Sequence, residues 1–214
     1  IPDLLFCSTT IDDSDFTLKN TTITTINYSA FFNTNLSTCN NFDLPSNLIS
    51  LKDKCFVGTQ FSKDAIITIP KTLKNVGSWN AQSFNGTTIP HLKFEDGLTT
   101  IPWDLFGYAI ITDPNFTLKD TTITSIGGRT FFGANLSACT NFDFPKNLES
   151  IEDECFVNTQ FNEDTVITIP KTFKSSGGWT RQSLKTTIPH LQFEDGLTTI
   201  PWDLFGDATI TDPN

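Results

Sequence analysis

Five cysteines are the side chains of this chain with the widest chemical scope. No two of Cys7, Cys39, Cys55, Cys139 and Cys155 have C-x-x-C spacing, and zinc would need four converging ligands. A Cys39–Cys55 disulfide is an alternative, but it would leave Cys7 unpaired. A buried thiol packs as a small apolar group, which is the interpretation that we favour for each cysteine. We therefore expect packed thiols and no metal site.

Two histidines, His91 and His190, occupy the same position in a repeated stretch of sequence. Each comes directly before an alternating apolar pair, so the alternation directs its ring outward. A histidine that acts as a general base needs a nucleophile to activate, and the chain has no G-x-S-x-G, H-E-x-x-H or Walker-type motif. The histidines are therefore expected to make surface contacts, and we predict neither an enzyme nor a cofactor.

Acidic turns and tryptophans are the remaining candidates for a site. The segment 12–15 and its counterparts 112–115 and 211–214 carry Asp and Asn just before an apolar pair. A calcium site would need more carboxylates than the later copies keep, so a turn stabilised by Asp and Asn side chains is favoured. Trp103 and Trp202 lie in a Pro-Trp-Asp turn, where a sugar or protein contact and packing against the neighbouring turn are equally open.

Composition excludes several classes of partner. The formal net charge is -10 and the sequence pI is about 4.5. Nucleic acids and anionic membranes attract Lys/Arg patches, so neither is an expected partner. No apolar run approaches the roughly 20 residues that a spanning helix needs, and the sequence shows no basic segment followed by an apolar one, so we expect no signal peptide within it. We expect no direct membrane insertion of this segment.

Long repeats organise the chain. The hexapeptide at 1–6 returns at 101–106 and at 200–205, which indicates two tandem copies, 1–100 and 101–199, and the start of a third, 200–214. Because the chain starts within this pattern, we interpret it as a fragment of a longer protein.

Each long copy consists of four shorter units. An apolar-x-apolar pair recurs every 24–26 residues, beginning at Phe16, Phe42, Ile67, Leu92, Phe116, Phe142, Ile167 and Leu191. Two apolar residues three apart follow each pair, usually with a Phe five positions later. In the third unit this Phe slips to Phe84, which implies about three extra residues, and Trp79 and Trp179 lie in this unit and its copy.

A period near 25 residues predicts a single repeat solenoid of about eight coils. Each apolar pair is expected to form a short strand with its apolar side chains inside and the intervening side chain outside. Twenty Phe residues suit a shared core, because Phe fills volume without requiring a polar partner. The predicted chain is mostly β-strand and turn, with few or no long helices.

The sequence from Cys39 to Phe56 resembles one unit of the BspA-like, treponemal-type leucine-rich repeat. Its pattern of Cys, Phe, Leu-Pro, Leu, Leu and Cys-Phe recurs from Cys139 to Phe156, and 67–73 and 167–173 match more briefly. The resemblance implies a right-handed leucine-rich-repeat solenoid, secretion or attachment to the cell surface, and a role in adhesion or host-protein binding. It implies no catalytic residues.

These features predict a binding module that uses the outward side chains of a solenoid sheet. The expected partner is a protein or glycan on another cell. The alternatives are a structural spacer that presents another domain, and end-to-end association of copies. The predicted contact residues are the outward strand positions and two turn tryptophans: Thr17, Asp43, Thr68, His91, Lys93, Glu95, Thr117, Asp143, Thr168, His190, Gln192, Glu194, Trp103 and Trp202.

Overall fold

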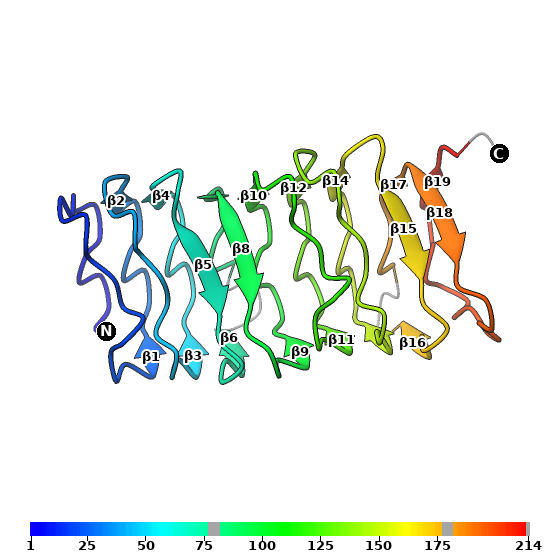
Figure 1. Ribbon diagram of the computed structural model, residues 1–214, viewed down its shortest axis with the longest axis horizontal. Helices are drawn as coiled ribbons and strands as arrows, with labels where there is room; N and C mark the ends of the chain where they lie inside the picture. Colours follow the sequence, from blue (N-terminus) through cyan, green and yellow to red (C-terminus); the bar gives the residue numbers. More distant parts are fainter. Residues whose placement is uncertain (77–81, 177–181, 213–214) are drawn as a thin grey trace.

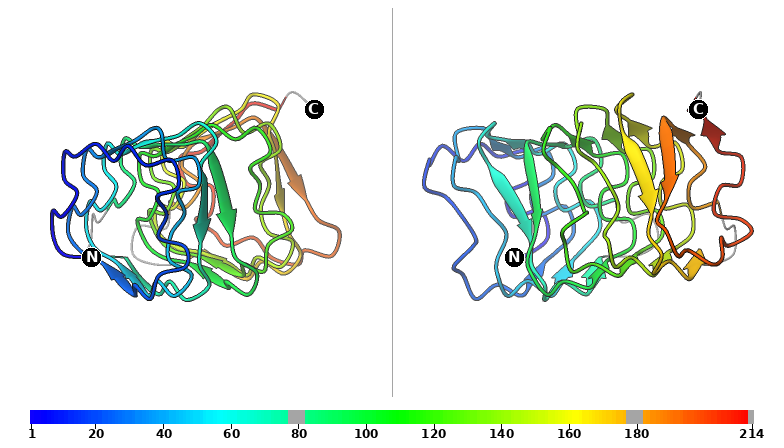
Figure 2. Two further views of the ribbon diagram at one scale, coloured as in Figure 1. Left: turned by 60° about the vertical axis from the view of Figure 1, so that its left-hand side comes forward. Right: turned by 45° about the vertical axis from the view of Figure 1, so that its right-hand side comes forward.

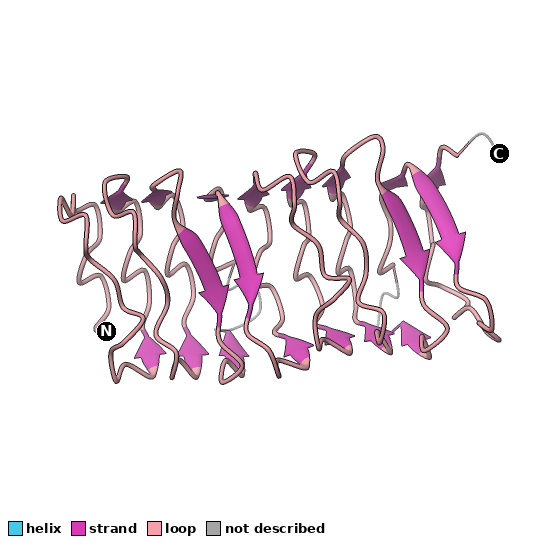
Figure 3. Ribbon diagram, viewed as in Figure 1, coloured by secondary structure: helices cyan, strands magenta, loops and turns pink. Residues whose placement is uncertain are grey.

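The computed structural model describes residues 1–76, 82–176 and 182–212. In these ranges the chain winds into a β-solenoid whose short parallel strands stack coil upon coil, and none of the described residues is helical (Figures 1 and 3). The predicted solenoid of strands and turns is confirmed. Accordingly, the described part of the chain offers no helix that could cross a membrane.

One sheet runs along the upper side of the solenoid as drawn in Figure 1. Its strands pair in parallel in the order β14-β12-β10-β7-β4-β2. Each strand buries its second residue, at least in part, and turns its first residue outward. The strands are β2 (Asn35–Leu36), β4 (Gln60–Phe61), β7 (Thr88–Ile89), β10 (Ile110–Ile111), β12 (Asn135–Leu136) and β14 (Gln160–Phe161). The pair β17 (Thr187–Ile188) and β19 (Thr209–Ile210) follows on the same side (Figure 1).

The lower side carries two more parallel sheets (Figure 1). The first contains β1 (Thr25–Ile26), β3 (Ser50–Leu51) and β6 (Asn75–Val76). The second contains β9 (Thr100–Ile101), β11 (Ser125–Ile126), β13 (Ser150–Ile151) and β16 (Ser175–Ser176). Paired residues are 25 positions apart, as in Thr25 with Ser50 and Ser50 with Asn75, so the sequence period is the length of one coil.

The longest strands lie on a third side, which faces the viewer in Figure 1 and which we call the front face. They form two separate pairs, β5 (Ile66–Ile69) with β8 (His91–Phe94) and β15 (Val166–Ile169) with β18 (His190–Phe193). The oblique views of Figure 2 show the three sides enclosing one interior, with the termini at opposite ends.

A column of phenylalanine rings fills this interior. Ring centroids of Phe31 and Phe56 are 5.1 Å apart and those of Phe56 and Phe84 are 4.9 Å apart. The column continues through Phe106, whose centroid lies 5.5 Å from that of Phe131. These distances are close to the spacing of about 4.8 Å between hydrogen-bonded strands, so each of these coils adds one ring to the column.

The third coil keeps its place in the column despite its extra residues. Gln60 pairs with Thr88, 28 positions later, and Thr88 pairs with Ile110, only 22 positions later. The insertion is therefore compensated within one coil, and Phe84 is fully buried at the level of the column. In the second copy the buried Leu184 holds the corresponding place.

A repeated left-handed turn brings each coil around. Non-glycine residues with positive φ recur at the same coil position, including Asn33 (φ 53°), Tyr108 (φ 58°) and Asn158 (φ 58°). Gly58 and Gly133 occupy this position in two other coils, with φ of 66° and 64°. Such a conformation is strained for most side chains and costs glycine nothing, so glycine is favoured at this position. Asn and, in one coil, Tyr108 also adopt it.

The strands predicted at the first two apolar pairs of each copy are absent from the described structure. Their side chains nevertheless point as predicted, because Leu18, Phe42 and Leu44 are buried. The backbone N–H of Asp43 donates to the Thr17 hydroxyl (3.2 Å) instead of to a carbonyl. A side-chain oxygen thus replaces the regular β-ladder at this point.

The prediction that Asp43 is exposed is wrong, since its residue exposure is 5%. Its Oδ1 accepts hydrogen bonds from the N–H groups of Leu44 (2.8 Å) and Thr68 (2.7 Å). Its Oδ2 pairs with Lys19 Nζ at 3.2 Å. The carboxylate therefore joins consecutive coils, as a backbone carbonyl would.

The second copy repeats this arrangement, so the predicted exposure of Asp143 is wrong for the same reason. Asp143 Oδ1 accepts from the N–H groups of Phe144 (2.8 Å) and Thr168 (3.0 Å), and Oδ2 pairs with Lys119 Nζ at 3.1 Å. Thr17, Thr68, Thr117 and Thr168 are half-buried rather than open to solvent.

The thiols divide into two environments. All five cysteines are free, and Cys39, Cys55, Cys139 and Cys155 are buried, as predicted. Burial raises the pKa of the Cys55 and Cys139 thiols to about 12 and also raises the pKa of Cys155. Cys7 lies partly exposed in the first turn, so the prediction that every thiol is packed is wrong at this position.

Replacing Asp43 with alanine should destabilise the fold markedly. Asp43→Ala leaves two N–H groups without their acceptor, and a buried unsatisfied group costs about 1–3 kcal/mol. We expect a loss of about 2–4 kcal/mol in the free energy of unfolding, measured by urea denaturation. The control is Asp64→Ala, whose exposed carboxylate pairs with the exposed Lys63 and should change stability by at most about 0.5 kcal/mol. Equal effects of the two substitutions would contradict the structural role of Asp43.

A thiol reagent should distinguish the two cysteine environments. In the native protein Cys7 should react quickly, while the four buried thiols should react only after denaturant is added, because they are covered and resist ionisation. Absorbance of the released reagent anion counts the reacted thiols. Cys7→Ser should abolish the native reaction, and rapid native labelling of Cys55 or Cys155 would show the coil alignment to be wrong.

Candidate functional site

The front face presents its outward side chains in register. Ile66 pairs with His91 and Thr68 with Lys93, so four outward side chains form a compact square on β5 and β8. Ile66 is 39% exposed, and Lys93 is exposed as predicted. An exposed isoleucine thus lies close to a lysine that forms no ion pair with another described residue.

The second copy presents a related square on β15 and β18. Val166 pairs with His190 and Thr168 with Gln192. Gln192 is exposed and takes the place of Lys93, so this square carries one positive charge fewer. The two squares are thus similar in shape and different in charge.

Glutamates border both squares and hold the chain as it leaves the strands. Glu95 Oε2 accepts a hydrogen bond from the Lys71 N–H (2.9 Å), and Glu95 Oε1 lies 3.6 Å from Lys71 Nζ. Glu194 has the same relation to Lys171, with distances of 2.9 and 3.3 Å. The Lys171 N–H holds the pKa of the Glu194 carboxyl below its usual value. These predicted contact residues therefore also stabilise the turn.

Each histidine has a carboxylate partner that the repeat pattern did not reveal. His91 Nδ1 lies 3.1 Å from Asp113 Oδ2, and His190 Nδ1 lies 3.6 Å from Asp212 Oδ2. Both aspartates follow their histidine by 22 positions and belong to the turns considered for calcium. The Asp113 Oδ1 atom accepts from the Asn115 N–H (2.9 Å), which confirms the favoured turn interpretation.

A polar hollow of about 340 Å³ lies beside the front face in the first copy. It occurs where the coils lack regular strands, so that Thr17, Asp43 and Ile66 border it. Because the polar groups of Thr17 and Asp43 bind backbone groups of neighbouring coils, they have little capacity left for a ligand. In this copy the predicted contact residues His91 and Lys93 remain available, together with the neighbouring Ile66.

The two turn tryptophans have different surroundings. A Cβ added at Gly128 would lie 2.7 Å from the Trp103 ring, so Gly128 makes room for that ring in the next coil. Trp103 is 37% exposed, whereas Trp202, in the last coil, is 79% exposed. Packing of the turn thus accounts for Trp103. The other two tryptophans, Trp79 and Trp179 of the third unit and its copy, lie outside the described residues.

Within ranges 1–76, 82–176 and 182–212, no group of three or more His, Cys, Asp or Glu side chains is placed to hold a metal ion. The features available for chemistry are the two His–Asp pairs and the squares of outward side chains next to them.

The comparison with protein families agrees with this geometry. The model of the BspA-type leucine-rich-repeat region matches residues 1–135, 50–183 and 112–214, with six copies of the repeat. No curated protein and no solved structure matches the chain. Since the family matches span the whole sequence, the chain belongs to the BspA-type leucine-rich-repeat family.

Proposed function

We propose that this chain is a non-enzymatic binding module of a secreted or cell-surface protein, which engages a protein partner through its front face. The observation that carries the proposal is the square of Ile66, Thr68, His91 and Lys93, which combines exposed apolar surface with a free cation. Leucine-rich-repeat solenoids commonly serve as extended binding surfaces, which supports a recognition role.

The chemistry of the square indicates the class of partner. Lys93 projects into solvent and Ile66 supplies an apolar contact beside it. A partner with an acidic side chain near an exposed aliphatic or aromatic group would complement both. Adhesion to a host protein or to a protein of another cell is the role that such a module would serve.

Charge reversal at Lys93 tests this proposal. Lys93→Glu should weaken binding to the partner about tenfold or more, because it places like charges together at the contact. The full chain is applied to an array of extracellular-matrix and plasma proteins, and the affinity for each bound protein is measured by surface plasmon resonance. Within the described part of the chain, the exposed Lys93 forms no ion pair, so the melting temperature should not change.

The matched control is Lys63→Glu, at a lysine whose side chain is 88% exposed in a turn between the upper side and the front face. It makes the same change of charge and should leave partner binding intact. Retention of every measured affinity by Lys93→Glu would contradict binding at the square.

A structural spacer is the second candidate function. The observation that favours it is the near-identical repetition of 100 residues, since added copies lengthen a solenoid without changing its cross-section. Absence of binding to any protein on the array would favour the spacer over the binding module.

A further inference from the structure

The upper side of the solenoid carries a second ordered set of outward side chains. The first residue of each strand stacks on the first residue of the next, as the register of Asn35 with Gln60 and of Asn135 with Gln160 shows. We call this set the amide–hydroxyl row; its members are Asn35, Gln60, Thr88, Asn135, Gln160, Thr187 and Thr209. Ile110 interrupts it between Thr88 and Asn135.

The row is uncharged in a strongly acidic chain. All seven members are amides or hydroxyls, although the chain has 24 acidic and 14 basic residues. The front face differs, because it places lysine, histidine and glutamate around each square. A neutral stripe along one side therefore offers hydrogen bonds without attracting ions of either sign.

Several members of the row are free to bind a ligand. Four side chains of the row are exposed and make no hydrogen bond to another residue in the described part of the chain: Gln60, Thr88, Gln160 and Thr187. Each amide can donate and accept, as can each hydroxyl. This contrasts with Thr17 on the front side, whose hydroxyl is used by the backbone.

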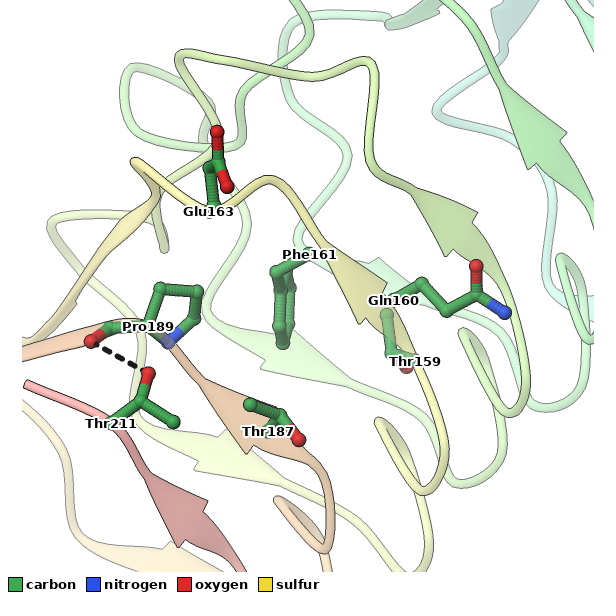
Figure 4. A pocket seen from close by; sticks show the side chains of 7 residues that line it. All are labelled: Thr159, Gln160, Phe161, Glu163, Thr187, Pro189 and Thr211. Atoms are coloured by element: carbon green, nitrogen blue, oxygen red, sulfur yellow. Dashed lines mark hydrogen bonds between the residues drawn. The ribbon is translucent and has the colours of Figure 1, made fainter.

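The row runs into a hollow of about 350 Å³ between β14 and the last strands (Figure 4). Gln160, Thr187 and the carboxylate of Glu163 contribute polar groups to its lining, and Phe161 and Pro189 contribute apolar surface. Figure 4 shows the Phe161 ring between the side chains of Gln160 and Pro189. A few polar groups around an apolar surface is the usual composition of a small-molecule site.

We infer that the amide–hydroxyl row binds an uncharged linear glycan laid along the solenoid, with one sugar ring seated in the hollow beside Phe161. Sugar hydroxyls both donate and accept hydrogen bonds, which matches the free amides and hydroxyls. The C–H face of a sugar ring packs on apolar surface such as the partly exposed ring of Phe161. The stack of side chains, repeated from coil to coil, suits a polymer better than a single sugar.

Other occupants fit the row less well. An anionic glycan or a nucleic acid would be repelled by the acidic chain, because the row has no lysine or arginine to offset the repulsion. A protein interface would be expected to centre on aromatic residues or arginine, whereas the row has only Ile110 as an exposed apolar side chain between its polar members. This site is separate from the front face and does not depend on the function proposed there.

Glycan binding by the full chain tests the inference. The probes are hexasaccharides of β-linked glucose, N-acetylglucosamine, mannose and xylose, with hyaluronan as the anionic comparison, and calorimetry gives the affinities. At least one neutral hexasaccharide should bind more tightly than its disaccharide, and hyaluronan should not bind. Gln160→Glu and Gln60→Glu should each weaken binding about three- to tenfold, since each loses a donor and adds a charge.

The control substitution is Asn47→Asp, which adds the same charge at an exposed turn outside the row and should leave glycan binding unchanged. Circular dichroism melting curves confirm that each variant is folded. The inference is overturned if no neutral hexasaccharide binds, or if binding survives both glutamine substitutions. The inference is also overturned if no glycan binds and the chain instead self-associates through the row. Sedimentation would then show dimers that dissociate in the Gln60→Glu variant. Loss of glycan binding in Lys93→Glu alone would place the site on the front face instead.

Discussion

The stacking of phenylalanine rings at the spacing of β-strands is the contact on which the rest of this solenoid depends. One coil cannot bury its own apolar side chains, so each ring must lie between the rings of its two neighbours. The centroid distance of 5.1 Å between Phe131 and Phe156 repeats the value for Phe31 and Phe56, one long copy earlier. The ring column therefore sets the distance between coils, and the short parallel strands on the three sides follow from it.

Polar side chains outside this column have two different tasks. Asp43 and Asp143 complete the hydrogen bonding of the backbone where regular strands are missing, so they belong to the framework. Lys93 and Gln160 stand at comparable outward positions and make no such bond in the described structure. Outward side chains of this solenoid thus fall into those whose polar atoms bind the backbone and those that stay open to solvent.

Much of the architecture was predictable because it depends on period alone. The spacing of the apolar pairs predicted the coil length and the inward positions of Phe42 and Ile67, and the slipped Phe84 predicted the extra residues of the third coil. The burial of Asp43 was not predictable from alternation, because it results from a contact with the next coil at Thr68. The pairing of His91 with Asp113 likewise joins two coils, and only the three-dimensional path brings these residues together. The amide–hydroxyl row was not predictable from the sequence, because each strand contributes a single outward residue, which is too few to show an alternation.

Truncation of one ring in the middle of the column tests this account most directly. Phe131→Ala, measured by denaturant unfolding, should lower the free energy of unfolding by about 3–5 kcal/mol, because it leaves a cavity between Phe106 and Phe156. Unfolding should remain cooperative if the coils on both sides share the column. A loss below about 1 kcal/mol would contradict the view that stacked rings hold the coils together.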